Sequence, residues 1–276
     1  MESKYLMYFK TVQGNTVKTL FEVLKDIWHD INLEFDSTGM KILTIDGTHV
    51  ALVYVKLKME SFEQYYCDET LIVGVNLSSL YKLIKTTTSH DTVVFYVSRD
   101  EPNKLGIELQ NADENKKTCF KLKLLDIDHN ECCIPELEFE SVITIPSVYF
   151  QRICRDMLKL SETIKIKSNG TNLILSCSGD FADQETVIGE TSAGMKMELK
   201  NMEVVEGCFS LKYLNLFVKA SALCNTVVLY MKKGYPLILE YKLAESSIKF
   251  MIAPKQNSSS ECGDELPNEI PDEDEF

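Results

Sequence analysis

Basic side chains recur at corresponding positions in two halves of this chain, and cations spaced in this way could bind phosphate groups. Residues 16–25 and 75–85 are repeated at 150–159 and 209–219 with one constant offset, so that Lys18 corresponds to Arg152 and Lys85 to Lys219. The bases on these segments are Lys18, Lys25, Lys82, Lys85, Arg152, Arg155, Lys159, Lys212 and Lys219. Contacts of this kind to phosphate do not depend on base sequence, and salt weakens them. The repeat therefore predicts a duplicated basic surface for a polyanion.

Amphipathic helices are the elements that must position these cations. In the first segment the apolar residues recur with the i, i+3, i+4, i+7 spacing of one helix face, at Val17, Leu20, Phe21, Leu24 and Ile27. The bases lie outside this stripe, and the other three segments follow the same pattern. We expect each stripe to pack on a sheet while the bases point away from it.

The balance of charge favours a dedicated surface over ordinary solvated helix faces. Ordinary solvation would explain basic residues on the outer face of one helix. The chain, however, has 42 acidic against 29 basic residues and still places bases on the outer faces of four predicted helices. Glu22, Asp26 and Asp156 interrupt the pattern, so binding is expected to be weak. No aromatic stacking platform is evident on these faces, which favours duplex over single-stranded nucleic acid.

Short segments rich in Val, Ile, Leu and Tyr predict strands between the helices. They span residues 41–45, 50–57, 92–97, 104–109, 120–125, 164–167, 173–177, 226–230, 237–243 and 248–252. The turn signal at 37–39 also corresponds to one at 168–170 in the second half. The predicted fold class is α+β, with two similar domains that each have antiparallel sheets outside and two helices inside.

The sequence divides into four parts. We expect an N-terminal domain at 1–125, an interdomain connecting linker at 126–140, a C-terminal domain at 141–256 and an acidic disordered tail at 257–276. The linker has little periodicity, and a connection of that length is typically functional or mobile.

Charge and composition exclude several classes of protein. The net charge is −13, and residues 256–276 hold eight acids and no bases, which leaves −5 on residues 1–255. An acidic body excludes a protein that coats nucleic acid over its whole surface, so any DNA-facing surface must be local. No signal peptide or run of eighteen apolar residues occurs, so we expect a soluble intracellular protein without a membrane partner. The nine cysteines are scattered without a C-x-x-C motif and are expected to be reduced thiols.

Patterns for catalysis and for metal or cofactor binding are missing or broken. Residues 126–130 resemble the start of a calcium loop, but Glu131 and Leu137 stand where that loop needs Gly and Glu. The chain has no phosphate-binding glycine loop, dinucleotide fingerprint or H-E-x-x-H motif, and its four histidines lie in no triad pattern. We therefore predict no catalytic residues, no metal and no cofactor. A nuclease that uses metal ions on scattered carboxylates is left open as the alternative.

Eight sequence strings resemble the proliferating cell nuclear antigen family of eukaryotic-type DNA sliding clamps. They include YYCDE at Tyr65, VGVNLSSLYKLIK at Val73, FQRICRDM at Phe150, KYLNLFVKA at Lys212 and IAPK at Ile252. VQG at Val12, the segment 45–53 and PLILEYKLA at Pro236 complete the set. The resemblance covers roughly residues 12–255.

The resemblance implies a closed ring of three chains that encircles duplex DNA and tethers DNA polymerase for processivity. The nine bases would then face the DNA in the central hole. Implied partners are DNA polymerase, a clamp loader, PIP-box proteins of replication and repair, and two further copies of the chain as a homotrimer. Implied subunit contacts lie on the edges 117–123 and 181–188, at Phe120, Phe181 and Val187. The implied location is the nucleus, or the replication site of a virus.

The resemblance also implies a pocket for partner peptides beneath the linker. Its wall would be Ile45, His49, Val50, Leu52, Ile127, Ile134, Pro135, Tyr235, Pro236, Ala253 and Pro254. Two departures from the family pattern, Cys132-Cys133 in the linker and Met251 near the pocket, affect peptide preference. Gly170 stands where many eukaryotic clamps have a modifiable lysine, and Lys167 is the neighbouring substitute. A subunit of a heterotrimeric checkpoint-type clamp is the alternative reading.

Overall fold

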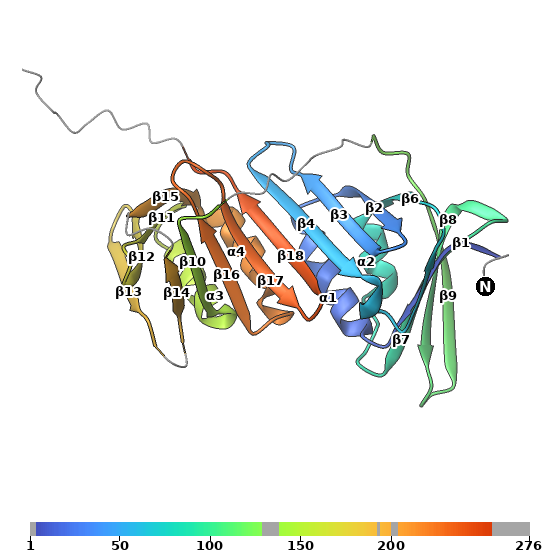
Figure 1. The fold of residues 1–276 in the computed structure, drawn as a ribbon. Coiled ribbons are helices and arrows are strands. Elements are labelled where there is room, and N and C mark those ends of the chain that lie inside the picture. Colours follow the sequence, from blue (N-terminus) through green and yellow to red (C-terminus); the bar gives the residue numbers. More distant parts are fainter. Residues whose placement is uncertain (1–3, 129–137, 192–193, 200–203, 256–276) are drawn as a thin grey trace, which may run out of the picture.

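The computed structural model describes residues 4–128, 138–191, 194–199 and 204–255, and these form three sheets and a layer of helices (Figure 1). The first half contains β1 (Tyr5–Thr11), α1 (Gly14–Leu24), β2 (Asp30–Asp36), β3 (Gly39–Ile45), β4 (Ala51–Lys58), η1 (Met59–Ser61), β5 (Gln64–Cys67), β6 (Leu71–Asn76), α2 (Leu77–Ile84), β7 (Asp91–Ser98), β8 (Glu101–Asn111) and β9 (Lys116–Lys123). The second half contains β10 (Ser141–Pro146), α3 (Ser147–Leu158), β11 (Thr163–Ser168), β12 (Asn172–Ser178), β13 (Asp183–Gly189), β14 (Lys196–Leu199), β15 (Val205–Ser210), α4 (Leu211–Phe217), η2 (Val218–Ala222), β16 (Thr226–Met231), β17 (Leu237–Leu243) and β18 (Ser246–Ile252).

The two halves share one continuous sheet. Its nine strands run in the order β14-β10-β16-β17-β18-β4-β3-β2-β6, and β18 of the second half pairs with β4 of the first. A five-stranded sheet, β5-β1-β7-β8-β9, lies at one end of the molecule, and a four-stranded sheet, β13-β12-β11-β15, lies at the other (Figure 1). Neighbouring strands pair antiparallel throughout the described residues. The predicted α+β class with antiparallel sheets and two helices in each half is confirmed.

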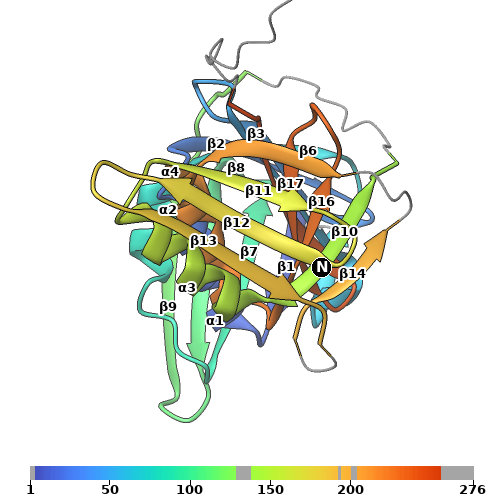
Figure 2. The same cartoon turned by 90° about the vertical axis from the view of Figure 1, so that its left-hand side faces the viewer.

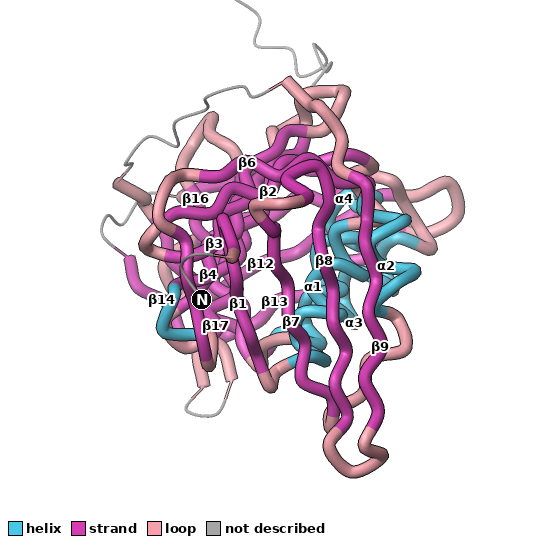
Figure 3. Tube along the Cα trace, turned by 90° about the vertical axis from the view of Figure 1, so that its right-hand side faces the viewer, coloured by secondary structure: helices cyan, strands magenta, loops and turns pink. Residues whose placement is uncertain are grey.

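The helices gather on one side of the sheets. Figures 2 and 3, which view the molecule from opposite ends, place α1, α2 and α3 together beside the strands. Helix α1 packs against α2, α3 packs against α4, and η2 of the second half contacts α1 of the first. One helix layer therefore spans the junction between the halves.

Burial of one apolar stripe fixes each helix on its sheet. In α1 the side chains of Val17, Leu20, Phe21 and Leu24 are buried in the core, as their spacing predicted. The core continues through both halves without a break. The bases of the helices are thereby left on the side away from the sheets.

Two predicted helix segments were too long at their N-terminal ends. Asn76 belongs to β6 and caps α2, because its side chain accepts a hydrogen bond of 2.9 Å from the backbone N–H of Ser79. Phe209 belongs to β15, where it lies opposite Ile164 of β11. Strand β9 begins and ends earlier than the predicted strand 120–125. In these places the boundary of the element is set by pairing between distant strands. Helical periodicity in the sequence carries no information on such pairing.

The repeat extends to the edges of the sheets. The N–H of Leu125 donates to the carbonyl of Gly74 in β6 at 2.9 Å, and the N–H of Lys255 donates to Cys208 in β15 at 2.8 Å. Gly74 and Cys208 are corresponding positions of the repeat. The residue near the end of each half is therefore bonded to the corresponding edge strand, β6 in the first half and β15 in the second.

Among the described residues, no helix is long and apolar enough to cross a membrane. The cysteines in this part of the chain are free: Cys67, Cys119, Cys154, Cys177, Cys208 and Cys224.

Candidate functional site

All nine predicted bases lie on the helix layer or directly after its helices. Lys18 is in α1, Lys82 in α2, Lys212 in α4 and Lys219 in η2. Arg152 and Arg155 are in α3, and Lys25, Lys85 and Lys159 follow the last residues of α1, α2 and α3. The structure thus brings together on one side residues that are far apart in the sequence, from Lys18 to Lys219.

The bases differ in how free they are to meet a ligand. Six are exposed, namely Lys82, Lys85, Arg152, Arg155, Lys159 and Lys212, whereas Lys18, Lys25 and Lys219 are half-buried. The Nζ of Lys18 donates to the carbonyl of Thr87 at 2.7 Å. Lys159 is paired with Asp156 at 2.9 Å. Part of the positive charge is therefore satisfied within the chain.

Asp26 neutralises two further bases. Its carboxylate accepts from Lys25 at 2.7 Å and from Lys219 at 2.5 Å. Burial works to raise the pKa of Asp26, but the hydrogen bonds from Lys219 and Lys25 outweigh it and hold the pKa below its usual value. Lys219 comes from the second half, so the pair also joins the two halves. The sequence identified Asp26 only as an interruption, because the fold alone brings Lys219 to it.

Six of the nine bases have no ion pair to a described residue. Lys18 among them is bonded to a backbone carbonyl, which leaves Lys82, Lys85, Arg152, Arg155 and Lys212. Arg152 lies over the ring of Tyr149, with 5.3 Å from its guanidinium carbon to the ring centre. These five groups can meet phosphate without first losing an intrachain carboxylate. A surface with so few free charges binds a polyanion weakly and reversibly.

Two predicted wall residues, Ile45 and Leu52, belong to an apolar row, here called the apolar floor, on the opposite face of the nine-stranded sheet. Four side chains lie directly opposite one another across neighbouring strands, in the order Ile238, Met251, Leu52 and Ile45. Ile45 is 39% exposed, which is unusual for an aliphatic residue in a row of this kind. Ile238 was missed in the sequence, although the alternation of β17 around the buried Leu237 and Leu239 would have placed it on this face.

A loop beside this floor is held by the buried carboxylate of Asp46. The backbone N–H groups of Val50 and Ala51 donate to it at 2.9 and 2.6 Å, and the hydroxyl of Tyr213 donates at 2.7 Å. Burial opposes ionisation, but hydrogen bonds from Thr48, Tyr213 and the backbone outweigh it and lower the pKa of Asp46 to about 2. The Asp46 loop therefore has a fixed shape that joins the first half to α4.

His49 lies at the exposed tip of the Asp46 loop, in the left-handed region with φ of 56°. Its N–H donates to the Asp46 carbonyl at 2.9 Å. The carbonyl of Val50 accepts from the N–H of Ala253 at 2.9 Å, so wall residues of both halves are directly bonded. Pro254 follows Ala253, and both are half-buried.

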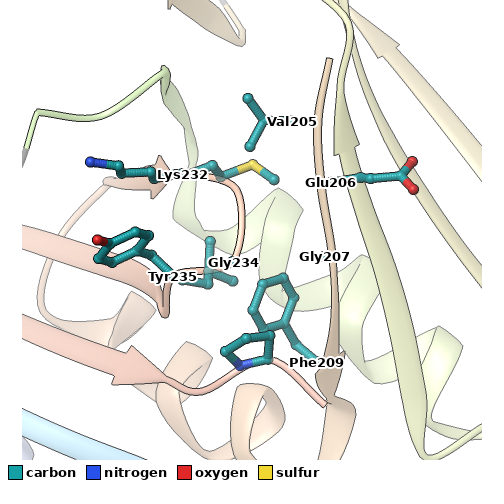
Figure 4. Close-up of a pocket in the computed structure, with 10 residues that line it drawn as sticks. Val205, Glu206, Gly207, Phe209, Lys232, Gly234 and Tyr235 are labelled. Carbon is teal, nitrogen blue, oxygen red and sulfur yellow. The ribbon is translucent and has the colours of Figure 1, made fainter. Parts of the chain in front are cut away.

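A pocket opens beside Tyr235 (Figure 4). It lies between β15, which contributes Glu206 and Phe209, and the turn from β16 to β17, with Pro254 completing the lining. Tyr235 is 42% exposed, its neighbour Pro236 is also exposed, and the Nζ of Lys232 lies 4.7 Å from the Tyr235 ring centre. Two of the predicted wall residues, Tyr235 and Pro254, thus line this pocket.

The start of the linker is attached to the first half. The carbonyl of Ile127 accepts from the side-chain amide of Asn32 at 3.2 Å, and Ile127 itself is half-buried. The other two predicted linker residues of the wall, Ile134 and Pro135, lie outside the described residues, as does the tail from 256.

The predicted contact residues lie at the two ends of the molecule. Phe120 is in β9 and packs partly against the core. Phe181 precedes β13 and is 79% exposed, and Val187 within β13 is 55% exposed. Strands β9 and β13 each end a sheet, so each has one edge without a partner strand among the described residues. Gly170 is in the turn from β11 to β12, and Lys167 is half-buried in β11.

Comparison with known proteins gives matches over nearly the whole described chain. The family model described as "Proliferating cell nuclear antigen, N-terminal domain" matches residues 6–132, and "Proliferating cell nuclear antigen, C-terminal domain" matches residues 133–256. The "Probable DNA polymerase sliding clamp 1" of Paramecium bursaria Chlorella virus 1 is 40% identical over 258 residues, which are 92% of this chain and 98% of that protein. The "Proliferating cell nuclear antigen" of Chaetomium thermophilum is 36% identical over 250 residues, 88% of this chain and 95% of that protein.

Proposed function

Since the chain belongs to the proliferating cell nuclear antigen family, we propose that it acts as a DNA sliding clamp by closing with two further copies into a ring around duplex DNA. The chain is a DNA-binding processivity factor of replication, as both relatives' names indicate. The ring, its trimeric state and the residues that face DNA are the proposed part. The ring would act wherever the DNA of its cell or virus is replicated.

The observation that carries this proposal is the single basic helix layer on an acidic chain. Bases from four helices and η2 gather on one side, although the chain has a net charge of −13. In a closed ring this side would face the hole, so that the helices attract phosphate while the acidic remainder repels it. Weak contacts are sufficient to keep the protein on DNA, because the closed ring of subunits prevents the duplex from leaving the hole. The same weakness allows movement along the duplex.

We assign polymerase, clamp-loader and PIP-box binding to the apolar floor and the neighbouring Tyr235 pocket. A row of apolar side chains that ends at the exposed Ile45, beside a fixed loop, suits the apolar face of a short helix. The contribution of Ile134 and Pro135 from the linker remains part of the proposal. The role of the chain is to hold other proteins on DNA, and we assign it no reaction of its own.

Topology distinguishes this function from ordinary DNA binding. The protein, loaded by its cognate clamp loader onto nicked circular DNA, should stay bound when the salt concentration is raised and should leave once the DNA is cut to a linear form. Native mass should correspond to three chains. Equal loss from circular and linear DNA would contradict encirclement, and a persistent single chain that needs two different subunits would favour the checkpoint-type alternative.

A further inference from the structure

Arg152 in α3 has two side chains within reach along its own helix, and they have opposite effects on its charge. Tyr149 lies one helical turn before it and Asp156 one turn after it, and both spacings place side chains on the same side of a helix. An aromatic ring holds a guanidinium and leaves its charge available, whereas a carboxylate neutralises it. The contact that Arg152 makes therefore decides whether it is a free cation.

The structure shows Arg152 against the ring. Its guanidinium carbon lies 5.3 Å from the ring centre of Tyr149, which is within the range of a cation–π contact. Among the described residues Arg152 has no ion pair. The carboxylate of Asp156 is paired with Lys159 instead, at 2.9 Å. Of its two neighbours on the helix, Arg152 thus contacts the one that leaves its charge unpaired.

Asp156 is nevertheless close enough to compete for Arg152. The pKa of Asp156 lies below its usual value, mainly because of the hydrogen bond from Lys159 and the charge of that lysine, and the charge of Arg152 adds to the effect. Asp156 is exposed, so packing does not hold its carboxylate in one place. A pair between two exposed side chains of this kind is weak. It would still occupy the guanidinium for part of the time if the ring were absent.

The ring of Tyr149 has a fixed position. Tyr149 is half-buried and packs against the hydrophobic core. The hydroxyl of Ser147 donates to the carbonyl of Cys224, which attaches the first turn of α3 to the segment that follows η2. An arginine held on a fixed surface has lost part of its freedom before it meets a ligand, so binding costs it less entropy.

The repeat provides a comparison inside the chain. Lys18 corresponds to Arg152, and Asn15 corresponds to Tyr149. No ring is present at this position in the first half, and there the Nζ of the half-buried Lys18 donates to the carbonyl of Thr87 at 2.7 Å. The cation beside a ring is exposed, whereas its counterpart without a ring is bonded to its own chain.

We propose that Tyr149 is a positioning residue, which holds the guanidinium of Arg152 outward on the helix layer and away from Asp156, where a phosphate of DNA can reach it. The proposal rests on the proposed function, in which Arg152 faces DNA, and it adds a residue that acts without touching DNA. A guanidinium packed on a ring keeps N–H groups free at its edge, and these can donate to two oxygens of one phosphate.

Two substitutions of Tyr149 separate the ring from its packing. Tyr149→Leu keeps an apolar side chain against the core but removes the ring, whereas Tyr149→Phe keeps the ring. Binding of the full chain to linear duplex DNA is measured by fluorescence anisotropy at low salt. We expect the affinity to fall about two- to fivefold in Tyr149→Leu and to stay within about twofold of wild type in Tyr149→Phe.

A double-mutant cycle with Arg152→Gln distinguishes positioning from a general structural role. If Tyr149 acts through Arg152, Tyr149→Leu weakens binding in the wild-type background and has no further effect in Arg152→Gln. A general structural role would give the same loss in both backgrounds. Asp156→Asn adds a second cycle: because it removes the competing carboxylate, it should raise the affinity more in Tyr149→Leu than in wild type.

Tyr81→Leu is the matched control on the same helix layer. The Nζ of Lys25 lies 4.9 Å from the ring centre of Tyr81, but Lys25 is also paired with Asp26 at 2.7 Å. A carboxylate already neutralises this cation, so removal of the ring should leave the affinity for DNA unchanged.

The outcomes separate the positioning role from the proposed function. A loss of affinity in Arg152→Gln without one in Tyr149→Leu, or equal losses from Tyr149→Leu in both backgrounds, overturns the role of Tyr149 and leaves Arg152 facing DNA. Unchanged affinity in Arg152→Gln overturns the assignment of Arg152 to the DNA-facing surface, and the role of Tyr149 with it.

Discussion

Asp26 in the first half of the chain is paired with Lys219 in the second half, at 2.5 Å between Oδ2 and Nζ. The other carboxylate oxygen accepts from Lys25 at 2.7 Å. One acid on the helix layer thus neutralises two of the nine bases and joins the two halves. The attraction for DNA that we propose for this surface is therefore weaker than its composition suggests.

Asp26→Asn should tighten binding to linear duplex DNA, because it frees two cations without adding one. We expect an increase of up to about tenfold at low salt and a salt dependence steeper by about one to two phosphate contacts. Loss of the pair should cost about 1 kcal/mol or less of unfolding free energy. Fluorescence anisotropy across a salt series measures the first effect. Glu245→Gln is the matched control, since it breaks another pair between the halves, Lys58 with Glu245 at 3.2 Å, on a different part of the surface. An equal gain from both variants would contradict the assignment.

Lys82→Glu combined with Arg152→Glu should shorten the products of polymerase in a processivity assay while the native mass stays unchanged. Both side chains are exposed on the helix layer, and reversing their charge places carboxylates where we expect the phosphates of DNA. Lys56→Glu with Lys242→Glu changes the net charge equally on the outer face of the nine-stranded sheet and should have little effect. Unchanged product length in the first variant would contradict the DNA-facing assignment.

Ile45→Ser should weaken binding of a PIP-box peptide by about tenfold or more, as expected for the loss of one buried aliphatic contact. Calorimetry with the purified protein measures this. Ile72→Ser is a close control, because Ile72 has the same side chain and a similar exposure of 41%, compared with 39% for Ile45, but lies in β6. We expect Ile134→Ala in the linker to weaken binding of the peptide as well. Equal affinity in Ile45→Ser and wild type would argue against the apolar floor.

Asp46→Asn should destabilise the protein at neutral pH and have a smaller effect in acid. The folded-state pKa of Asp46 lies at about 2, below the ordinary value of 3.8, so the carboxylate stabilises the fold above about pH 4. That stabilisation, on the order of 2 kcal/mol, is lost as the pH falls from about 4 to about 2. Chemical unfolding of both proteins at several pH values gives the difference. A difference that does not shrink in acid would show that Asp46 acts by shape and not by charge.

The sequence predicted the helices and the placement of the bases on them, because both are local patterns. The stripe from Val17 to Leu24 identifies α1 and, by exclusion, the side on which Lys18 lies. The position of the bases on one layer followed from the same stripes. The stripes do not predict which bases are free and which are paired, because pairing depends on contacts between distant residues such as Lys219 and Asp26.

Features that depend on strand pairing were the least predictable. The floor row from Ile238 to Ile45 crosses four strands from both halves, and no window of sequence contains it.

The shared nine-stranded sheet has a mechanical consequence. Inside the chain, the junction of β18 with β4 is reinforced by side-chain pairs at three places, Asp26 with Lys219, Tyr213 with Asp46 and Lys58 with Glu245. The described parts of the two halves are therefore held together by the shared sheet and by these side-chain pairs. In the ring that we propose, the seams between chains lack these internal pairs, so we expect a loader that admits DNA to part a seam and leave each chain intact.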